Sequence, residues 1–358
     1  MTQLAAIEEK VNGGGRVTDG EALWLYEHAD LHDLGRLANR VRERKNGNRA
    51  TYVVNRFINY SNICILDCKF CSFARRKRDA DAFELTVSEI VDLAQQAAAD
   101  GVTEVHIVGG LHPSLPFAYY TDLLRALRQA APALTVKAFS AVEIRHLAGR
   151  VAKKSIRATL ELLRDAGLAA LTGGGAEIFD PAVRAQICAV KDSADEWLEV
   201  HRAWHRLGQR STCTMLYGHV ETPAHRLDHL RRLRELQDET GGFTAFIPYV
   251  FEPANNQLAH LRRITALEEL RTLAVSRVYL DNFDHLTAYW VSMGLPLATV
   301  SLDYGVDDLH GTVREEKVFH MAGAQTPLAL TVERLTQAIR AAGREPAQRG
   351  TVYQEIGR

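Results

Sequence analysis

Short apolar runs, rich in β-branched residues, alternate along most of the chain with longer stretches in which apolar residues recur every three or four positions. The first pattern is typical of buried strands and the second of amphipathic helices. Strands are predicted at Thr51–Tyr60, Glu104–Val108, Thr135–Phe139, Ala170–Thr172, Ser211–Tyr217, Thr244–Val250, Arg277–Leu280 and Ala298–Leu302. Helices are predicted between them at Val87–Asp100, Tyr119–Ala130, Ser155–Ala166, Ala194–Leu207, Pro223–Thr240 and Ala266–Ala274.

The first fifty residues carry helical patterns only. Thr18 is placed to cap one short helix, and Leu31–Arg44 forms a second amphipathic run. Eight strands alternating with helices, without a linker, predict an α/β protein with a single (β/α)8 TIM-type barrel. We expect an N-terminal helical extension over residues 1–50, the barrel over 51–325, and a C-terminal helix and tail over 326–358 that packs on the barrel. Functional residues of such a barrel lie in the loops that follow its strands.

Composition narrows the class of protein. Of 358 residues, 46% are hydrophobic and 24% are charged, which is typical of a soluble enzyme. The net charge of −1 provides no electrostatic footprint for nucleic acid or a membrane surface. No segment has the apolar length of a membrane helix, and the first residues lack a signal-peptide pattern. Few, unpaired cysteines fit a reducing compartment, so we expect a cytoplasmic enzyme with a small-molecule substrate.

Three closely spaced cysteines are the clearest candidates for metal binding. Cys64, Cys68 and Cys71 form the pattern C-x3-C-x2-C directly after the first predicted strand, and the chain has only five cysteines. Thiolates this close together indicate a soft metal or an iron–sulfur cluster. The other two, Cys188 and Cys213, stand alone and are interpreted as structural.

The triplet leaves two alternatives open. A [4Fe-4S] cluster held by three thiolates has one iron free to bind another molecule, whereas clusters ordinarily take four. A structural zinc ion also needs four ligands, and a distant histidine could complete the set. The candidate histidines are His106, His112 and His219.

Together with Phe70, which precedes the last cysteine, the triplet resembles the radical S-adenosylmethionine (SAM) superfamily. Membership implies a [4Fe-4S] cluster whose free iron chelates SAM. A second feature fits the resemblance, because Gly109-Gly110 ends the second predicted strand. At this point the superfamily uses glycine carbonyls to accept hydrogen bonds from the SAM amine, and glycine lets the backbone approach a ligand closely.

Two further strand ends carry candidate SAM contacts. The third strand is followed by Ser140 and Glu143, and this carboxylate is interpreted either as an acceptor for SAM or substrate or as a first-turn acid of the next helix. The segment Thr214-Met-Leu-Tyr-Gly-His-Val-Glu221 resembles the superfamily pattern G-x-I-x-G-x-x-E, with threonine in place of the first glycine. The resemblance implies that Leu216 packs on adenine and that Gly218 leaves room for it.

Substrate contacts are expected from polar residues at the remaining strand ends, and the candidates are Arg75, His112, His219, Asn255 and His310. Arg75 also begins the basic run Arg75-Arg-Lys-Arg78, which is interpreted either as a solvated face or as a docking site for an acidic flavodoxin or ferredoxin that donates electrons.

Within the superfamily, segments such as Val105–Pro113, Thr172–Phe179 and Asp308–Lys317 resemble the aminofutalosine synthases of menaquinone biosynthesis. The resemblance implies that the 5′-deoxyadenosyl radical adds to 3-[(1-carboxyvinyl)oxy]benzoate, and that rearrangement and decarboxylation give 6-amino-6-deoxyfutalosine. The alternative is a dehypoxanthine futalosine cyclase or a related enzyme that uses SAM only as a radical initiator.

Overall fold

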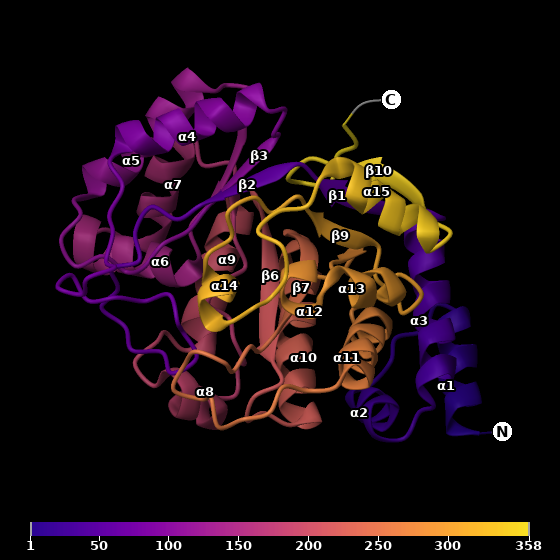
Figure 1. Cartoon of the computed structure of the whole chain (residues 1–358). Coiled ribbons are helices and arrows are strands. Elements are labelled where there is room, and N and C mark those ends of the chain that lie inside the picture. Colours follow the sequence, from indigo (N-terminus) through magenta and orange to yellow (C-terminus); the bar gives the residue numbers. More distant parts are fainter. Residues whose placement is uncertain (1, 357–358) are drawn as a thin grey trace.

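The computed structural model describes residues 2–356 and has a parallel sheet at its centre (Figure 1). Seven strands pair in the order in which they occur along the chain. They are β2 (Asn55–Ile58), β3 (Glu104–Ile107), β4 (Thr135–Ala138), β5 (Ala170–Leu171), β6 (Arg210–Tyr217), β7 (Phe243–Val250) and β8 (His285–Leu286). All of these pairings are parallel, as expected for strands joined by helices.

The strand β9 (Asp308–Gly311) joins the two edges of this sheet. Thr287, just after β8, forms a parallel bridge with Asp308, and Arg314, just after β9, bridges Arg56 of β2. The main chain reinforces the seam, because the amide of Ala288 donates to the carbonyl of Asp308 at 2.8 Å. The predicted α/β barrel is therefore confirmed, with a seam made of single bridges on both sides of β9.

Helices cover the outside of the barrel. The connecting helices are α4 (Val87–Ala99), α5 (Phe117–Ala130), α7 (Ile156–Ala166), α9 (Ala194–Arg206), α10 (Pro223–Thr240) and α11 (Ala266–Tyr279), which confirms the six predicted positions. Several begin with a capping box, in which a Ser or Thr side chain and a glutamate three residues later satisfy the first backbone N–H groups. Shorter segments lie between or after them: α6 (Ala141–His146), the π-helical turn Leu147–Ala152, α8 (Pro181–Cys188), α12 (Trp290–Met293), α13 (Leu295–Ser301) and α14 (Val318–Ala322).

The N-terminal helices α1 (Gln3–Asn12), α2 (Asp19–Glu27) and α3 (Leu31–Asn46) lie against the α10–α11 side of the barrel (Figure 1). Thr18 caps α2 through a capping box with Glu21, as its position in the sequence predicted. Helix α3 packs on α11, and α2 packs on both α10 and α11.

Three strand predictions need correction. The predicted strand Thr51–Tyr60 is two strands, because the chain breaks after β1 (Arg49–Val53) before β2 begins. Arg277–Leu280 is wrong, since this apolar run is the end of α11. Ala298–Leu302 is also wrong, because it belongs to α13 and the residue that follows it. The last two strands of the barrel lie further along the chain, at β8 and β9.

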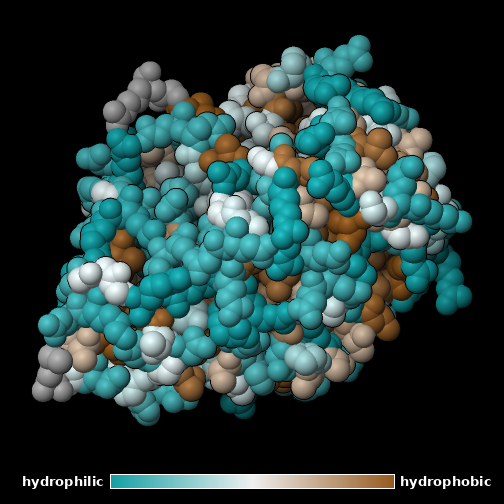
Figure 2. Space-filling model, turned by 180° about the vertical axis from the view of Figure 1, so that it is seen from behind, coloured by the Kyte–Doolittle hydropathy of each residue, from teal (hydrophilic) through white to brown (hydrophobic). Residues whose placement is uncertain are grey.

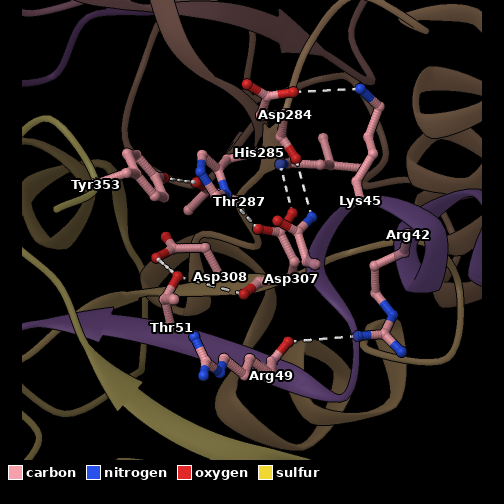
Figure 3. Close-up of polar contacts among 12 residues, drawn as sticks. Arg42, Lys45, Arg49, Thr51, Asp284, His285, Thr287, Asp307, Asp308 and Tyr353 are labelled. Atoms are coloured by element: carbon pink, nitrogen blue, oxygen red, sulfur yellow. Dashed lines mark hydrogen bonds and ion pairs between the residues drawn. The ribbon is translucent and has the colours of Figure 1, made fainter. Parts of the chain in front are cut away.

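The amino-terminal end of the barrel is closed by the last described residues. β1 lies between β9 and β10 (Glu345–Gln348), which follows α15 (Val332–Ala341). Arg349 is buried and forms a bidentate ion pair with Asp308, with N···O distances of 2.6 and 3.1 Å. Tyr353 stacks on His285 with ring centroids 3.8 Å apart, and its hydroxyl contacts that of Thr287 (Figure 3).

The surface shows no band of exposed apolar side chains on the face drawn in Figure 2, where polar residues predominate and apolar ones are scattered. Among the described residues, no helix combines the length and hydrophobicity needed to cross a bilayer.

Candidate active site

A cavity opens at the carboxyl ends of the barrel strands. Cys64, Cys68 and Cys71 all line it, together with Phe70. The loop that follows β2 therefore brings the predicted triplet to one cavity, at the end of the barrel where chemistry was expected.

Backbone hydrogen bonds fix this cysteine loop. The amide of Cys64 donates to the carbonyl of Arg75 at 2.9 Å, and the amide of Ile65 donates to Leu111, just beyond the glycine pair, at 3.1 Å. The guanidinium of Arg76 donates to the carbonyl of Cys64 at 2.6 Å. The basic run that follows the triplet is thus partly used to hold it in place.

Gly109 and Gly110 pack directly beneath the loop. A Cβ atom on Gly110 would lie 2.3 Å from the carbonyl oxygen of Ile63 and 2.9 Å from Cβ of Cys64. A Cβ atom on Gly109 would lie 2.6 Å from the ring of Tyr60. Glycine is therefore required at both positions for the cysteine loop to reach its place over the cavity.

The donor chemistry fits an iron–sulfur cluster. Three cysteines of one loop line one cavity, which supplies the three thiolates that a [4Fe-4S] cluster with one open iron requires. Burial raises the pKa of the Cys68 thiol to about 12, and the nearby Lys191 ammonium opposes this rise. Binding to iron would stabilise the thiolate form that burial disfavours.

Glu143 holds the glycine loop. It is the third residue of α6 and forms a capping box with Ser140, whose amide and hydroxyl donate to its Oε2 atom at 2.7 and 2.8 Å. Its Oε1 atom accepts from the hydroxyl of Tyr60 at 2.9 Å and from the amide of Gly109 at 3.1 Å. Burial raises the pKa of Glu143, while these four donors favour the ionised form. Ser140 and Glu143 line the cavity, their contact with SAM stays a prediction, and the first-turn interpretation describes the contacts of Glu143.

The remaining predicted SAM contacts lie nearby. Leu216 lines a smaller hollow that shares Phe70, Cys71 and Glu177 with the main cavity. Gly218 lines neither. Its φ is +90°, a conformation that favours glycine, and its amide donates to Glu221 at 2.6 Å.

The candidate substrate residues separate into three groups, none of which lines the main cavity. Arg75 and Asn255 lie in a hollow on the outer side of the cysteine loop, where Arg75 pairs with Asp81 at 2.7 Å. His112 and His219 are engaged elsewhere, His112 by Glu84 at 2.7 Å and His219 by Glu221 at 3.0 Å. His310 is buried beside Tyr289, and its side chain forms no hydrogen bond among the described residues. Their roles in substrate binding stay predictions.

Several cavity residues were not singled out from the sequence. Lys191, in the segment after α8, forms an ion pair with Glu177 and lies 5.4 Å from the ring centroid of Phe70. Burial opposes its charge, but the carboxylate of Glu177 and the neighbouring thiols raise the pKa of Lys191, which keeps it protonated. The other missed lining residues include His106 (named only as a possible zinc ligand), Thr212, Tyr249, Tyr289, Glu316 and Phe319. A lone lysine in a loop carries no pattern that would have identified it.

Comparisons with known proteins agree with this geometry. The family model "Radical SAM superfamily" matches residues 58–233, and the model "CofH/MqnC C-terminal region" matches residues 240–357. The chain is 47% identical over 358 residues to aminodeoxyfutalosine synthase of Thermus thermophilus, covering 99% of this chain and 96% of that protein. It is 38% identical to cyclic dehypoxanthine futalosine synthase of Streptomyces coelicolor, with coverage of 99% and 90%. A solved structure of methylornithine synthase superimposes with a TM-score of 0.75 at 19% identity, covering 95% of this chain and 97% of that one.

Proposed function

The chain belongs to the radical SAM superfamily, and from this membership we propose that it catalyses the aminodeoxyfutalosine synthase reaction of menaquinone biosynthesis. In this reaction the 5′-deoxyadenosyl group of SAM is joined to 3-[(1-carboxyvinyl)oxy]benzoate, and rearrangement with decarboxylation gives 6-amino-6-deoxyfutalosine. The observation that carries the proposal is the 47% identity to a synthase along nearly the whole chain, against 38% to the cyclic dehypoxanthine futalosine enzyme.

The cofactors of this superfamily are a [4Fe-4S] cluster and SAM, and Cys64, Cys68 and Cys71 are the residues that would hold the cluster. When bound, the cluster supplies the electron that cleaves SAM into methionine and the 5′-deoxyadenosyl radical. The protein's own task is to place the two reactants in contact and to keep water away. Tyr249, Tyr289 and Phe319 form a continuous aromatic wall of the cavity, with ring centroids 4.8 to 5.4 Å apart, and this wall supports that task.

The electron donor is proposed to dock on the outer side of the cysteine loop. Cys71 lines both the main cavity and the outer hollow, so the cluster would be separated from a partner there by little more than this residue. The hollow is rimmed by Arg75, which is paired with Asp81, and by the exposed Lys69, whose charge favours an acidic partner such as a flavodoxin or ferredoxin. All five cysteines are free thiols, which supports a reducing cytoplasm as the place of action.

Anaerobic turnover tests the reaction. The reconstituted protein, SAM, dithionite and 3-[(1-carboxyvinyl)oxy]benzoate are expected to give a product that contains both adenosine and the benzoate ring, detected by mass spectrometry. Cys68→Ala should abolish product formation and iron binding. Cys213 lies in β6 and does not line the cavity, so Cys213→Ala should retain both. Free 5′-deoxyadenosine formed with dehypoxanthine futalosine, and no adduct with the benzoate, would identify the cyclase instead.

A separate experiment tests the docking site. Lys69→Glu should slow turnover supported by a flavodoxin and leave dithionite-supported turnover unchanged, because the small reductant does not need the rim. Equal rates of the variant and the wild-type protein with flavodoxin at low salt would contradict the assignment.

A further inference from the structure

Three polar side chains that line the cavity form no side-chain hydrogen bond among the described residues. They are His106, Thr212 and Tyr289, and their exposed fractions are 7%, 3% and 2%. All three line the cavity. Most of each side chain is buried, and its residue lines the cavity, so a polar ligand in the cavity can supply the hydrogen-bond partner that the protein does not.

The three side chains come from separate parts of the barrel, and we call them the floor site. His106 lies inside β3 and Thr212 near the start of β6, whereas Gly109 and the cysteines follow the ends of their strands. Tyr289 follows β8, and its ring packs edge-on against His310 with centroids 5.0 Å apart. His106 and Thr212 are therefore deeper in the barrel than the cysteine loop.

The floor site offers neutral hydrogen-bond donors. Burial keeps the pKa of the Tyr289 phenol well above its ordinary value and the pKa of the His106 imidazole well below. With the Thr212 hydroxyl, the site then has up to three O–H or N–H groups free to donate. Donors fixed in a cavity sheltered from water stabilise an oxyanion strongly.

The charged groups around the floor site have partners of opposite charge and leave the site open to an anionic ligand. Lys137 is the register partner of His106 on β4 and is itself buried. Below it, Glu104 faces Lys137, and Arg349 is already paired with Asp308. The carboxylates that line the cavity already have partners. Glu143 accepts from its four donors, and Glu177 pairs with Lys191. Glu316 pairs with His320 and also accepts from the amides of Val318 and Phe319.

We propose that His106, Thr212 and Tyr289 form a binding site for the ring carboxylate of an aryl carboxylic acid. The identity of that acid as 3-[(1-carboxyvinyl)oxy]benzoate rests on the proposed function. With the ring carboxylate at the floor, the vinyl ether at the meta position points up toward the cysteine loop, where the adenosyl carbon must meet it. The floor site thus sets which end of the substrate reacts.

Binding of simple probes tests the floor site without turnover. Calorimetry on the reconstituted protein would compare 3-methoxybenzoate with methoxybenzene, which lacks only the carboxylate. Thr212→Val and Tyr289→Phe should each weaken 3-methoxybenzoate about tenfold, or roughly 1.4 kcal/mol, and leave methoxybenzene unchanged. Tyr279→Phe, which removes a phenol paired with Asp19 far from the cavity, is the matched control and should change neither.

Other outcomes overturn the inference. Equal weakening of both probes would mean that the variants disturb the shape of the cavity, and no measurable binding of 3-methoxybenzoate to the wild-type protein would mean that there is no aryl-carboxylate site. Loss of binding in Lys191→Met with no effect of the floor variants would assign the carboxylate to Lys191.

The turnover and binding experiments test the proposed function and the floor site independently of each other. If the wild-type protein makes no adduct in the turnover experiment but Thr212→Val still weakens only the carboxylate probe, the substrate assignment is wrong and the floor site stands. If the adduct forms and both floor variants bind 3-methoxybenzoate normally, the function stands and the floor site is rejected. His106→Gln, which keeps a neutral donor, should bind the probe more tightly than His106→Leu.

Discussion

The hydroxyl of Tyr60 donates a hydrogen bond to the carboxylate of Glu143 at 2.9 Å, inside the barrel wall. Tyr60 immediately precedes the cysteine loop, and Glu143 also holds the amide of Gly109. One carboxylate therefore ties the loop that carries the thiols to the loop that carries the glycine pair.

Glu143→Gln is expected to loosen this connection. The amide group of glutamine would present N–H bonds to donors that need acceptors, at a cost of about 1–3 kcal/mol in the free energy of unfolding. We also expect weaker SAM binding by the reconstituted protein, measured by equilibrium dialysis. Glu89→Gln is the matched control, because Glu89 occupies the same capping-box position in α4 at the surface and should leave SAM binding unchanged.

Gly110→Ala should displace the cysteine loop. The new methyl group would overlap the carbonyl of Ile63, so the loop must move or the protein lose about 1–3 kcal/mol of stability. The measurement is iron content and the visible absorption spectrum after anaerobic reconstitution, and both should fall. Gly149→Ala, at a position with open space around it, should reconstitute like the wild-type protein. Full iron content in Gly110→Ala would contradict the role assigned to the close approach.

Arg349→Met should destabilise the fold. Removal of the guanidinium leaves the buried carboxylate of Asp308 without its ion-pair partner, at a cost of about 3–5 kcal/mol. Arg314→Met removes an ion pair to Asp100 in which both side chains are exposed, and it should cost less than about 1 kcal/mol. Chemical denaturation of both variants provides the comparison, and similar midpoints would show that the Arg349 pair contributes little.

The pair of Glu316 and His320 should make stability depend on pH. The hydrogen bond to Glu316 raises the pKa of His320 to about 9 in the folded state, against an ordinary value of about 6.5. A raised pKa means that the folded state holds the proton more tightly, so the contribution is complete below pH 6.5 and is lost as the pH rises through 9. His320→Gln should flatten the decline in unfolding free energy between these values, while His260→Gln on an exposed loop should not. An unchanged slope in His320→Gln would exclude the pair as its source.

Local pattern was enough to predict most of the barrel but not its last part. Strands such as β6 and β7 are eight residues long and lie between regular helical patterns. The end of α11 was predicted as a strand because every residue from Leu270 to Tyr279 except Arg271 is buried, so its polar residues do not mark an exposed face. Without an exposed polar face, a buried helix and a buried strand are hard to tell apart from the sequence. β8 has only two residues, too few for any periodicity.

The residues that line the cavity could likewise be predicted only in part. The cysteines and the glycine pair could be predicted because their spacing along the chain is itself the signal. Lys191, Thr212 and Tyr289 could not, because each lies in a different segment and only the closed barrel brings them to one cavity. The position after a strand does not by itself show that a side chain is free to bind a ligand: His112 and His219 follow strands, their side chains contact Glu84 and Glu221, and their roles in substrate binding stay predictions.

The pairing of β1 with β9 and β10 has a consequence for synthesis on the ribosome. Asn48 and Gly343, which are joined by a hydrogen bond beside these strands, are 295 residues apart in the chain. While the cysteine loop and the helices up to α13 are being made, β1 has neither neighbour, so its two edges stay unpaired until β9 and β10 follow about 250 residues later. Synthesis of β9, rather than formation of the cysteine loop, then sets the earliest moment at which the barrel can close around a cluster.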